Sequence, residues 1–331
     1  MAQEHTDRLH TTALAMVAPP RGILAADESP GTMSKRLEGV GVEPTASARR
    51  DYREMLVTTP GLSSSVSGVI LADETFDQEL SDGRSVPKAC TDAGLLVGIK
   101  VDTGAKALAF APGETVTEGL DGLRERLADY ASRGAAFAKW RAALSIGAAL
   151  PSERAVLTNA HALGRYAALC QEAGIVPIVE PELVMEGDHG IDRCEQATGD
   201  TLDVVFQSLL AQGVDLAGIV LKPNMVVAGQ DCPRTPTVDE VATATVRMLS
   251  GHVPATVPGI AFLSGGQPAE VATAHLAAIA ARVTPWQLTF SFGRALVDPA
   301  LRAWAGDPTR WKDGQAALDE RARANAAVLA A

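Results

Sequence analysis

Short apolar runs rich in Val, Ile and Leu recur along the chain. Each gives way to polar residues and then to a segment with apolar residues at helical spacing. Near-continuous apolar runs of this length are typical of parallel strands buried on both faces, whereas half-exposed antiparallel strands alternate. The pattern predicts eight strands, at residues 22–26, 66–71, 95–99, 135–138, 175–179, 216–221, 259–263 and 286–290. Helices are predicted between them, with clear examples at 118–132, 153–173 and 238–250.

Strand followed by helix, eight times over, is the pattern of a closed (β/α)8 barrel, also called a TIM barrel. The alternative is a doubly wound open sheet, which usually has fewer strands. No Pro/Ser-rich linker divides the sequence, so residues 1–331 are predicted to form one α/β domain. The barrel core is expected at about residues 21–300, between a short N-terminal helix that ends before Pro19 and a C-terminal helical segment at 301–331.

Charged or hydroxyl residues follow every predicted strand. They are Asp27 to Ser29, Asp73 and Glu74, Lys100 and Asp102, Lys139 and Arg141, Glu180 and Glu182, Lys222 and Asn224, Ser264 to Gly266, and Ser291 to Arg294. A single one of these could be a solvated loop residue. Barrel enzymes, however, assemble their active sites at the carboxyl ends of several strands. Because all eight strands end in this way, we expect an active site there.

The strand-end residues suit an anionic substrate and acid/base chemistry. The expected cations are Lys100, Lys139, Arg141, Lys222 and Arg294, and the expected carboxylates are Asp27, Glu180 and Glu182. Two glycine-containing turns, at Ser264-Gly265 and Gly293-Arg294, follow the seventh and eighth strands, which form the usual phosphate site of such barrels. Ser29, Lys35 and Arg36 offer further hydroxyl and cationic groups, although they could equally form a helix cap and a solvated first turn.

None of the six histidines continues a predicted strand, so a zinc site built on imidazoles is not expected. Without a metal, a lysine can supply the electron sink for carbanion chemistry by forming an iminium with a ketone. Spacing alone does not identify which lysine. Neither a dinucleotide-binding glycine motif, nor a nucleoside-triphosphate loop, nor a serine nucleophile elbow is present.

Composition excludes several classes of protein. With 331 residues, 47% of them apolar, the chain can bury a large core and is unlike a disordered protein. Its net charge of -11 argues against nucleic acid as the main partner. No apolar run is long enough to cross a membrane, and Glu4 and Asp7 disfavour a signal peptide. The four cysteines are widely spaced, so we expect reduced thiols and a cytoplasmic location.

Six of the strand-end segments carry a family resemblance. They are Gly22-Ile-Leu-Ala-Ala-Asp-Glu-Ser29, Gly98-Ile-Lys-Val-Asp102, Phe137-Ala-Lys-Trp-Arg141, Ile175-Val-Pro-Ile-Val-Glu-Pro-Glu182, Leu221-Lys-Pro-Asn-Met225 and Phe262-Leu-Ser-Gly-Gly-Gln267. With these motifs in the same order, the sequence resembles the class I fructose-bisphosphate aldolases from about residue 8 to the C-terminal helix. The resemblance implies reversible cleavage of fructose 1,6-bisphosphate to dihydroxyacetone phosphate and glyceraldehyde 3-phosphate, with neither metal nor other cofactor.

The resemblance also implies roles for individual residues. Lys222 would be the Schiff-base nucleophile, and Glu180 the general acid/base during formation and dehydration of the carbinolamine. Asp27 would take or help transfer the proton of the C4 hydroxyl. Lys139 would keep both carboxylates charged, and Glu182 with Arg141 would complete the network of charges.

For the phosphates, the resemblance implies two groups of residues. Ser264, Gly265, Gly293 and Arg294 would hold one phosphate. Ser29, Lys35, Arg36 and Lys100 would shape the opposite side. Relatives are often homo-oligomers, commonly tetramers, so a homo-oligomer is expected besides the phosphosugar substrate. Phe292 stands where many relatives have Tyr, and the lost hydroxyl is expected near the phosphate site.

Two other functions fit the same residues. One is another lysine-dependent phosphosugar aldolase or a transaldolase, which needs only one phosphate site. The other is a non-catalytic scaffold on this fold, although such a protein has no need to keep Lys222, Glu180 and Asp27.

Overall fold

The computed structural model describes residues 2–330. Its helices and strands are α1 (Ala2–Val17), β1 (Gly22–Ala26), α2 (Pro30–Glu38), α3 (Ala46–Val57), β2 (Val66–Leu71), α4 (Asp73–Phe76), α5 (Val86–Asp92), β3 (Leu96–Lys100), β4 (Gly104–Ala107), β5 (Thr115–Glu118), α6 (Leu123–Ser132), β6 (Phe137–Leu144), α7 (Glu153–Glu172), β7 (Val176–Leu183), α8 (Ile191–Ala211), β8 (Val220–Leu221), α9 (Val238–His252), β9 (Gly259–Phe262), α10 (Ala269–Ala280), β10 (Gln287–Phe292), α11 (Arg294–Trp304) and α12 (Trp311–Ala327). Three short 3₁₀ turns lie at Leu62–Ser64, Leu216–Gly218 and Pro308–Arg310.

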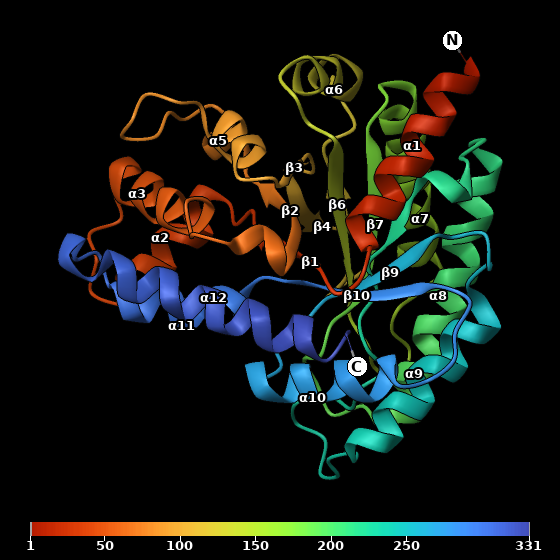
Figure 1. Ribbon diagram of the computed structural model, residues 1–331. Coiled ribbons are helices and arrows are strands. Elements are labelled where there is room, and N and C mark those ends of the chain that lie inside the picture. The colour runs from red at the N-terminus through yellow and green to blue at the C-terminus, as the bar shows by residue number, and fades with distance from the viewer. Residues whose placement is uncertain (1, 331) are drawn as a thin grey trace.

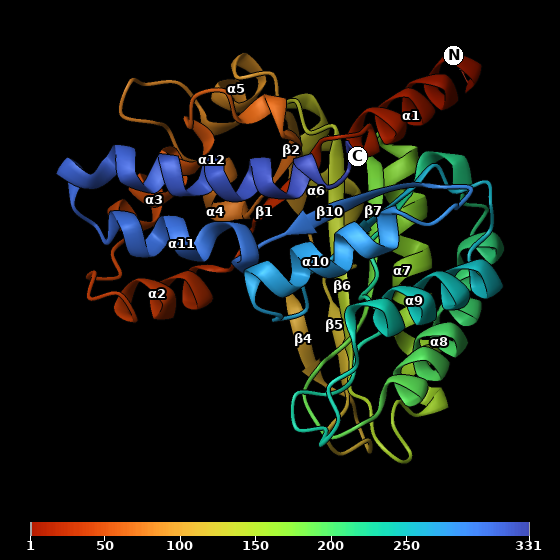
Figure 2. The same cartoon turned by 60° about the horizontal axis from the view of Figure 1, so that its bottom comes forward.

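Eight of the strands in residues 2–330 close into a parallel barrel, in the order β1-β10-β9-β8-β7-β6-β3-β2. The helices surround it, as Figures 1 and 2 show. The predicted (β/α)8 barrel is therefore confirmed, and β1 and β2 have the predicted bounds. The sixth predicted strand, 216–221, is too long. Its first part forms a 3₁₀ turn, and only Val220–Leu221 joins the sheet.

A β-hairpin made of β4 and β5 was not predicted. The sequence pattern predicts a helix from residue 118, but Thr115–Glu118 pairs antiparallel with Gly104–Ala107, and the helix begins at Leu123. The residues of β5, Thr-Val-Thr-Glu, include β-branched residues that favour a strand. The buried side chain of Asn159 on α7 fixes this strand, because its Oδ1 accepts a hydrogen bond of 3.1 Å from the Thr117 amide.

Apolar side chains form two layers, one inside the barrel and one between the strands and the helices. On β6, Phe137 belongs to the inner layer, whereas Ala138 and Trp140 belong to the outer layer. Side chains alternate along a strand, so Lys139 and Arg141 share the inward face of Phe137. The same alternation brings the strand-end residues of the other strands toward the barrel mouth.

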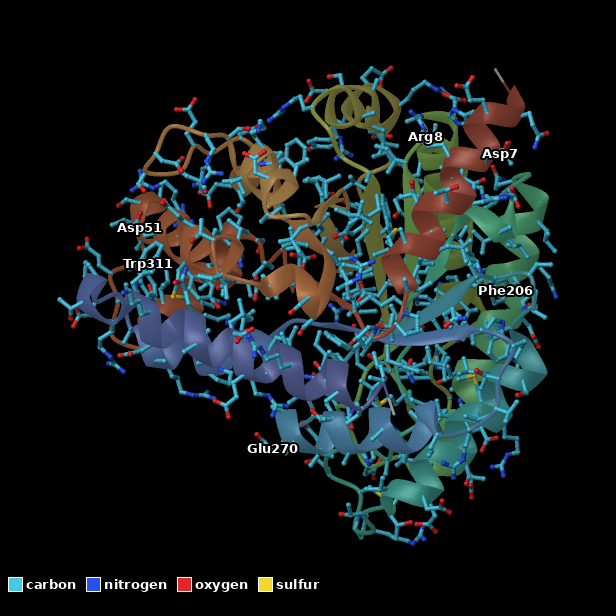
Figure 3. The ribbon with its side chains drawn as sticks, viewed as in Figure 1. Asp7, Arg8, Asp51, Phe206, Glu270 and Trp311 are labelled. Atoms are coloured by element: carbon cyan, nitrogen blue, oxygen red, sulfur yellow. The ribbon has the colours of Figure 1, made fainter. Side chains whose placement is uncertain are left out.

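Helix α1 closes the amino end of the barrel. Its residues Leu9, Ala13, Met16 and Val17 pack on the inner layer. Gly259 on β9 has no side chain because a Cβ there would lie 2.5 Å from a methyl group of Val17. In Figure 3, Asp7 and Arg8 mark α1, and Trp311 marks the start of α12 on the opposite side of the view. None of the helices described is both long and apolar enough to span a membrane.

Candidate active site

The carboxyl ends of the strands surround a cavity of about 460 Å³. Most of the predicted site residues line it: Asp27, Ser29, Arg36, Lys100, Lys139, Arg141, Glu180, Glu182, Lys222, Ser264, Gly265, Gly293 and Arg294. Lys35 does not line it. It lies on α2 with an exposed side chain, because the helix turns that position outward while Arg36 turns toward the cavity.

Four buried strand-end side chains form a continuous chain of charges at the bottom of the cavity: Asp27, Lys139, Glu180 and Lys222. Lys139 Nζ lies 2.6 Å from Asp27 Oδ2 and 3.2 Å from Glu180 Oε2. Lys222 Nζ lies 3.0 Å from the other oxygen of Glu180, Oε1. None of the four side chains is more than 11% exposed. Glu180 therefore lies between two ammonium groups, within reach of both.

The neighbouring charges decide the protonation of this chain. Burial alone would raise the pKa of Asp27, but Lys139 and Lys222 outweigh it and lower that pKa to about 2. Glu180 behaves in the same way: burial opposes ionisation, and Lys139 and Lys222 nevertheless lower its pKa. Burial would lower the pKa of Lys139, whereas Asp27 and Glu180 raise it above its usual value. All three groups are thus charged at neutral pH.

Two further ion pairs flank this chain. Arg141 donates to Glu182, and this carboxylate outweighs burial and raises the pKa of Arg141. Lys100 Nζ lies 2.6 Å from Oδ1 of Asp102, whose Oδ2 accepts from the Arg141 amide at 3.2 Å. Asp102 was not among the predicted site residues. Its position directly after β3, two residues beyond Lys100, was the signal available in the sequence.

The loops after β9 and β10 meet at one side of the cavity. Gly265 and Gly266 have φ of 57° and 86°, in the left-handed region that glycine adopts most readily. A Cβ on Gly266 would lie 3.1 Å from a terminal nitrogen of Arg294. Arg294 is exposed and, within residues 2–330, has no ion pair, and it begins α11 directly after Gly293. This guanidinium and the free amides of the helix start form a suitable site for an anion.

The loop between β1 and α2 lines the cavity next to the β10 loop, because β1 and β10 are neighbours in the barrel. Ser29 caps α2 by accepting from the Thr32 amide, and its hydroxyl also lies 3.1 Å from that of Thr32. Arg36 lines the same side. Both ends of its guanidinium are paired, with Glu28 and with Asp298 of α11.

On β10, Ser291 and Phe292 point to opposite faces of the sheet. Ser291 lines the cavity, and its buried hydroxyl has no hydrogen-bond partner among the described residues. Phe292 is fully buried in the outer apolar layer, 5.5 Å from Phe290 between ring centroids. The expectation that the missing hydroxyl at Phe292 affects the phosphate site is therefore wrong, because alternation turns this ring toward the helices.

Within residues 2–330, no group of three or more His, Cys, Asp or Glu side chains is arranged to hold a metal ion. The four cysteines are free thiols, and three of them, Cys90, Cys170 and Cys194, are buried.

Comparisons with known proteins point to one family. Residues 8–330 match the family model described as "Fructose-bisphosphate aldolase class-I". A relative from Xanthomonas campestris pv. campestris, named probable fructose-bisphosphate aldolase class 1, is 51% identical over 96% of each chain. Fructose-bisphosphate aldolase B of Gallus gallus is 47% identical over 98% of this chain and 90% of its own.

Among solved structures, a fructose-bisphosphate aldolase from Plasmodium falciparum, crystallised with TRAP and a small-molecule inhibitor, superposes with a TM-score of 0.97. It is 41% identical to this chain, and the match covers 98% of this chain and 95% of that one. The family model matches nearly the whole chain, and the relatives from Xanthomonas and Gallus are 51% and 47% identical to it in sequence. This chain therefore belongs to the class I fructose-bisphosphate aldolase family.

Proposed function

We propose that this protein reversibly cleaves fructose 1,6-bisphosphate to dihydroxyacetone phosphate and glyceraldehyde 3-phosphate through a Schiff base on Lys222. One observation carries the proposal: the Lys222 amine lies 3.0 Å from a Glu180 oxygen at the bottom of a cavity that has cationic groups on two sides. A nucleophile with an adjacent proton-transfer group is the arrangement that iminium chemistry needs.

The first steps involve Lys222 and Glu180. Lys222 first passes a proton to the Glu180 carboxylate beside it, and its neutral amine then attacks the C2 carbonyl carbon, forming a C–N bond. The proton that the nitrogen loses moves to the carbonyl oxygen, which becomes the hydroxyl of a carbinolamine. Glu180 then passes a proton to this hydroxyl, which leaves as water, and the iminium forms. Glu180 Oε1 suits this transfer because it lies 3.0 Å from Lys222 Nζ, the atom that bears the carbinolamine.

The strand order suggests how the substrate lies. β9 is next to β8, and Lys222 directly follows β8, so the C1 phosphate, one carbon from the bonded C2, fits the loops with Ser264 and Arg294. β1 and β3 are each three positions from β8 around the barrel. The C6 phosphate, four carbons from C2, therefore fits the side with Ser29, Arg36 and Lys100.

Cleavage of the C3–C4 bond would then use Asp27. As the C4 hydroxyl loses its proton to Asp27, the bond electrons move to C3 and into the iminium, giving an enamine and releasing the aldehyde product. Lys139, 2.6 Å from Asp27, keeps this carboxylate charged until the proton arrives. Protonation of the enamine at C3 and hydrolysis of the imine return Lys222 and release dihydroxyacetone phosphate.

Borohydride trapping tests the proposal. The protein is incubated with dihydroxyacetone phosphate and EDTA, reduced with borohydride and mapped by mass spectrometry. We expect one adduct, on Lys222, that is absent from Lys222→Arg and present in a control, Lys106→Arg, on the exposed strand β4. An adduct on a different lysine, or cleavage that EDTA abolishes, would refute the proposed mechanism.

The family also suggests a homo-oligomer, commonly a tetramer, in the cytoplasm. Light scattering coupled to size-exclusion chromatography measures the oligomeric state directly.

A further inference from the structure

We propose that Asp298 on α11 is a positioning residue for Arg36 and thereby sets how well the protein recognises the second, C6 phosphate. The inference rests on the proposed function, since it concerns the residues proposed to bind the C6 phosphate. It starts from a set of four charged side chains, Arg53, Glu28, Arg36 and Asp298, that runs from the core to the rim of the cavity.

Arg36 is held at both ends. Its Nη1 donates to Oε1 of Glu28, and its Nη2 donates to Oδ1 of Asp298. The Arg36 side chain is 15% exposed and lines the cavity. A guanidinium with both terminal nitrogens anchored has a fixed plane, and a fixed plane favours directional contacts to phosphate oxygens.

Glu28 pairs with two arginines, Arg36 and Arg53. Its other oxygen, Oε2, accepts from Arg53 at 2.7 Å, and Arg53 is only 2% exposed. Removing Glu28 would leave a buried guanidinium without its partner, which destabilises a protein strongly. Asp298 differs, because it is 33% exposed and no ion pair other than that with Arg36 is found for it in the described chain. Asp298 is thus the anchor whose removal affects Arg36 and little else.

Asp298 also connects the two proposed phosphate sites. It lies four residues after Arg294, one turn further along the same helix, so α11 carries both the free guanidinium of one anion site and the anchor for the other. The pair between Asp298 and Arg36 ties this helix to α2. The spacing between the two cationic groups is then fixed by an ion pair between the two helices rather than by either loop alone.

Two effects of removing Asp298 oppose each other. The loss of a negative charge near the cavity favours anion binding, whereas the loss of an anchor frees a long side chain that must be ordered again on binding. Asp298 is one-third exposed, so solvent and salt screen its charge. The loss of the anchor therefore dominates, and recognition of the C6 phosphate becomes weaker.

Steady-state kinetics with two substrates test this inference. Asp298→Ala should raise KM for fructose 1,6-bisphosphate by about five-fold and leave KM for fructose 1-phosphate, which lacks the second phosphate, within about two-fold. Asp298→Asn keeps an acceptor oxygen and should fall between wild type and Asp298→Ala. In an Arg36→Ala background, Asp298→Ala should add no further rise, since the residue it positions is absent. Asp313→Ala, which removes an exposed acid from α12, is the matched control and should leave both KM values unchanged.

Calorimetry with a non-cleavable hexitol 1,6-bisphosphate gives a readout that needs no catalysis. Asp298→Ala should weaken binding of this bisphosphate by about five-fold, as for KM, and leave binding of the corresponding hexitol 1-phosphate unchanged. Equal effects on both ligands, no effect on either, tighter binding of the bisphosphate, or a further rise in the Arg36→Ala background would each overturn the proposal. If wild type binds the bisphosphate but cleaves neither substrate, the proposed function fails while calorimetry still decides the role of Asp298.

Discussion

Lys139 is the residue on which the charges of the active site depend, because it contacts two carboxylates that burial would otherwise neutralise. Its Nζ lies within 3.2 Å of both Asp27 and Glu180, whereas Lys222 contacts only Glu180. Asp27 thus has no other direct cationic partner in the described chain. A single buried ammonium keeps Asp27 ready to receive the C4 hydroxyl proton.

Replacing Lys139 with Met should lower kcat by about 10²-fold or more, the size typical of lost acid/base assistance. Without this cation, the burial of Asp27 raises its pKa from about 2, so the acid limb of the kcat/KM profile moves to higher pH. A pH–rate profile measures both effects. Lys100→Met, which removes a cation paired with Asp102 from the same cavity, should raise KM for the bisphosphate and shift the acid limb much less. A similar acid limb in Lys139→Met and wild type would contradict this role.

For single residues, the sequence predicts which side chains lie at the strand ends, but it does not predict their ion-pair partners. The sequence places Lys139, Glu180 and Lys222 at the ends of apolar runs, and a parallel barrel brings such ends together. Which oxygen faces which ammonium depends on strand order and register, and neither follows from one sequence. The same limit explains Arg36: its cavity position was expected, but its partner Asp298 is 262 residues away in sequence.

Elements were predicted where one physical pattern dominates. Strands buried on both faces have long apolar runs, so β1 and β2 have the expected bounds. The hairpin at 104–118 was missed because its strands are only four residues long, β4 is mostly exposed, and neither strand contains an apolar run to detect. The strand β8 is shorter than predicted because Leu216 and Gly218 form a turn before it.

The tight interior of the barrel gives a prediction for β3. A Cβ on Gly98 would lie 2.1 Å from Cε2 of Phe137, a large ring that fills the space left by the glycine. Gly98→Ala should therefore lower the free energy of unfolding by about 1–3 kcal/mol, the usual cost of overpacking. Urea unfolding followed by circular dichroism measures it.

Two controls separate crowding from a general effect of the substitution. Gly251→Ala on α9, where a Cβ would have no neighbour within 4 Å, should stabilise the protein by about 0.5–1 kcal/mol through helix propensity. Gly98→Ala combined with Phe137→Leu should be less destabilised than the sum of the two single variants. Additivity of the two changes would show that the ring and the new methyl group do not compete for space.

For the whole molecule, the buried charges link stability to pH. The usual pKa of an aspartate is 3.8, and that of Asp27 in the fold is about 2, so the fold gains stability from the ionised form of Asp27 above pH 3.8 and loses that gain as pH falls toward 2. The gain corresponds to about 2 kcal/mol. Glu180 contributes in the same direction, because its pKa is also lowered. The pKa of Lys139 is raised above 10.5, so its contribution is complete below that pH and is lost only in strong alkali.

We therefore expect the urea midpoint of wild type to fall steeply between pH 4 and pH 2 (values set by the pKa of Asp27 outside and inside the fold). Asp27→Asn removes the group that titrates, so its midpoint should be lower at neutral pH, where Lys139 loses a partner, but should fall less steeply in acid. The control Asp121→Asn changes an exposed acid before α6 and should keep the wild-type slope. If Asp27→Asn and wild type lose stability with the same slope, the acid sensitivity of the fold does not come from the titration of Asp27, because removing this carboxylate would have left it intact.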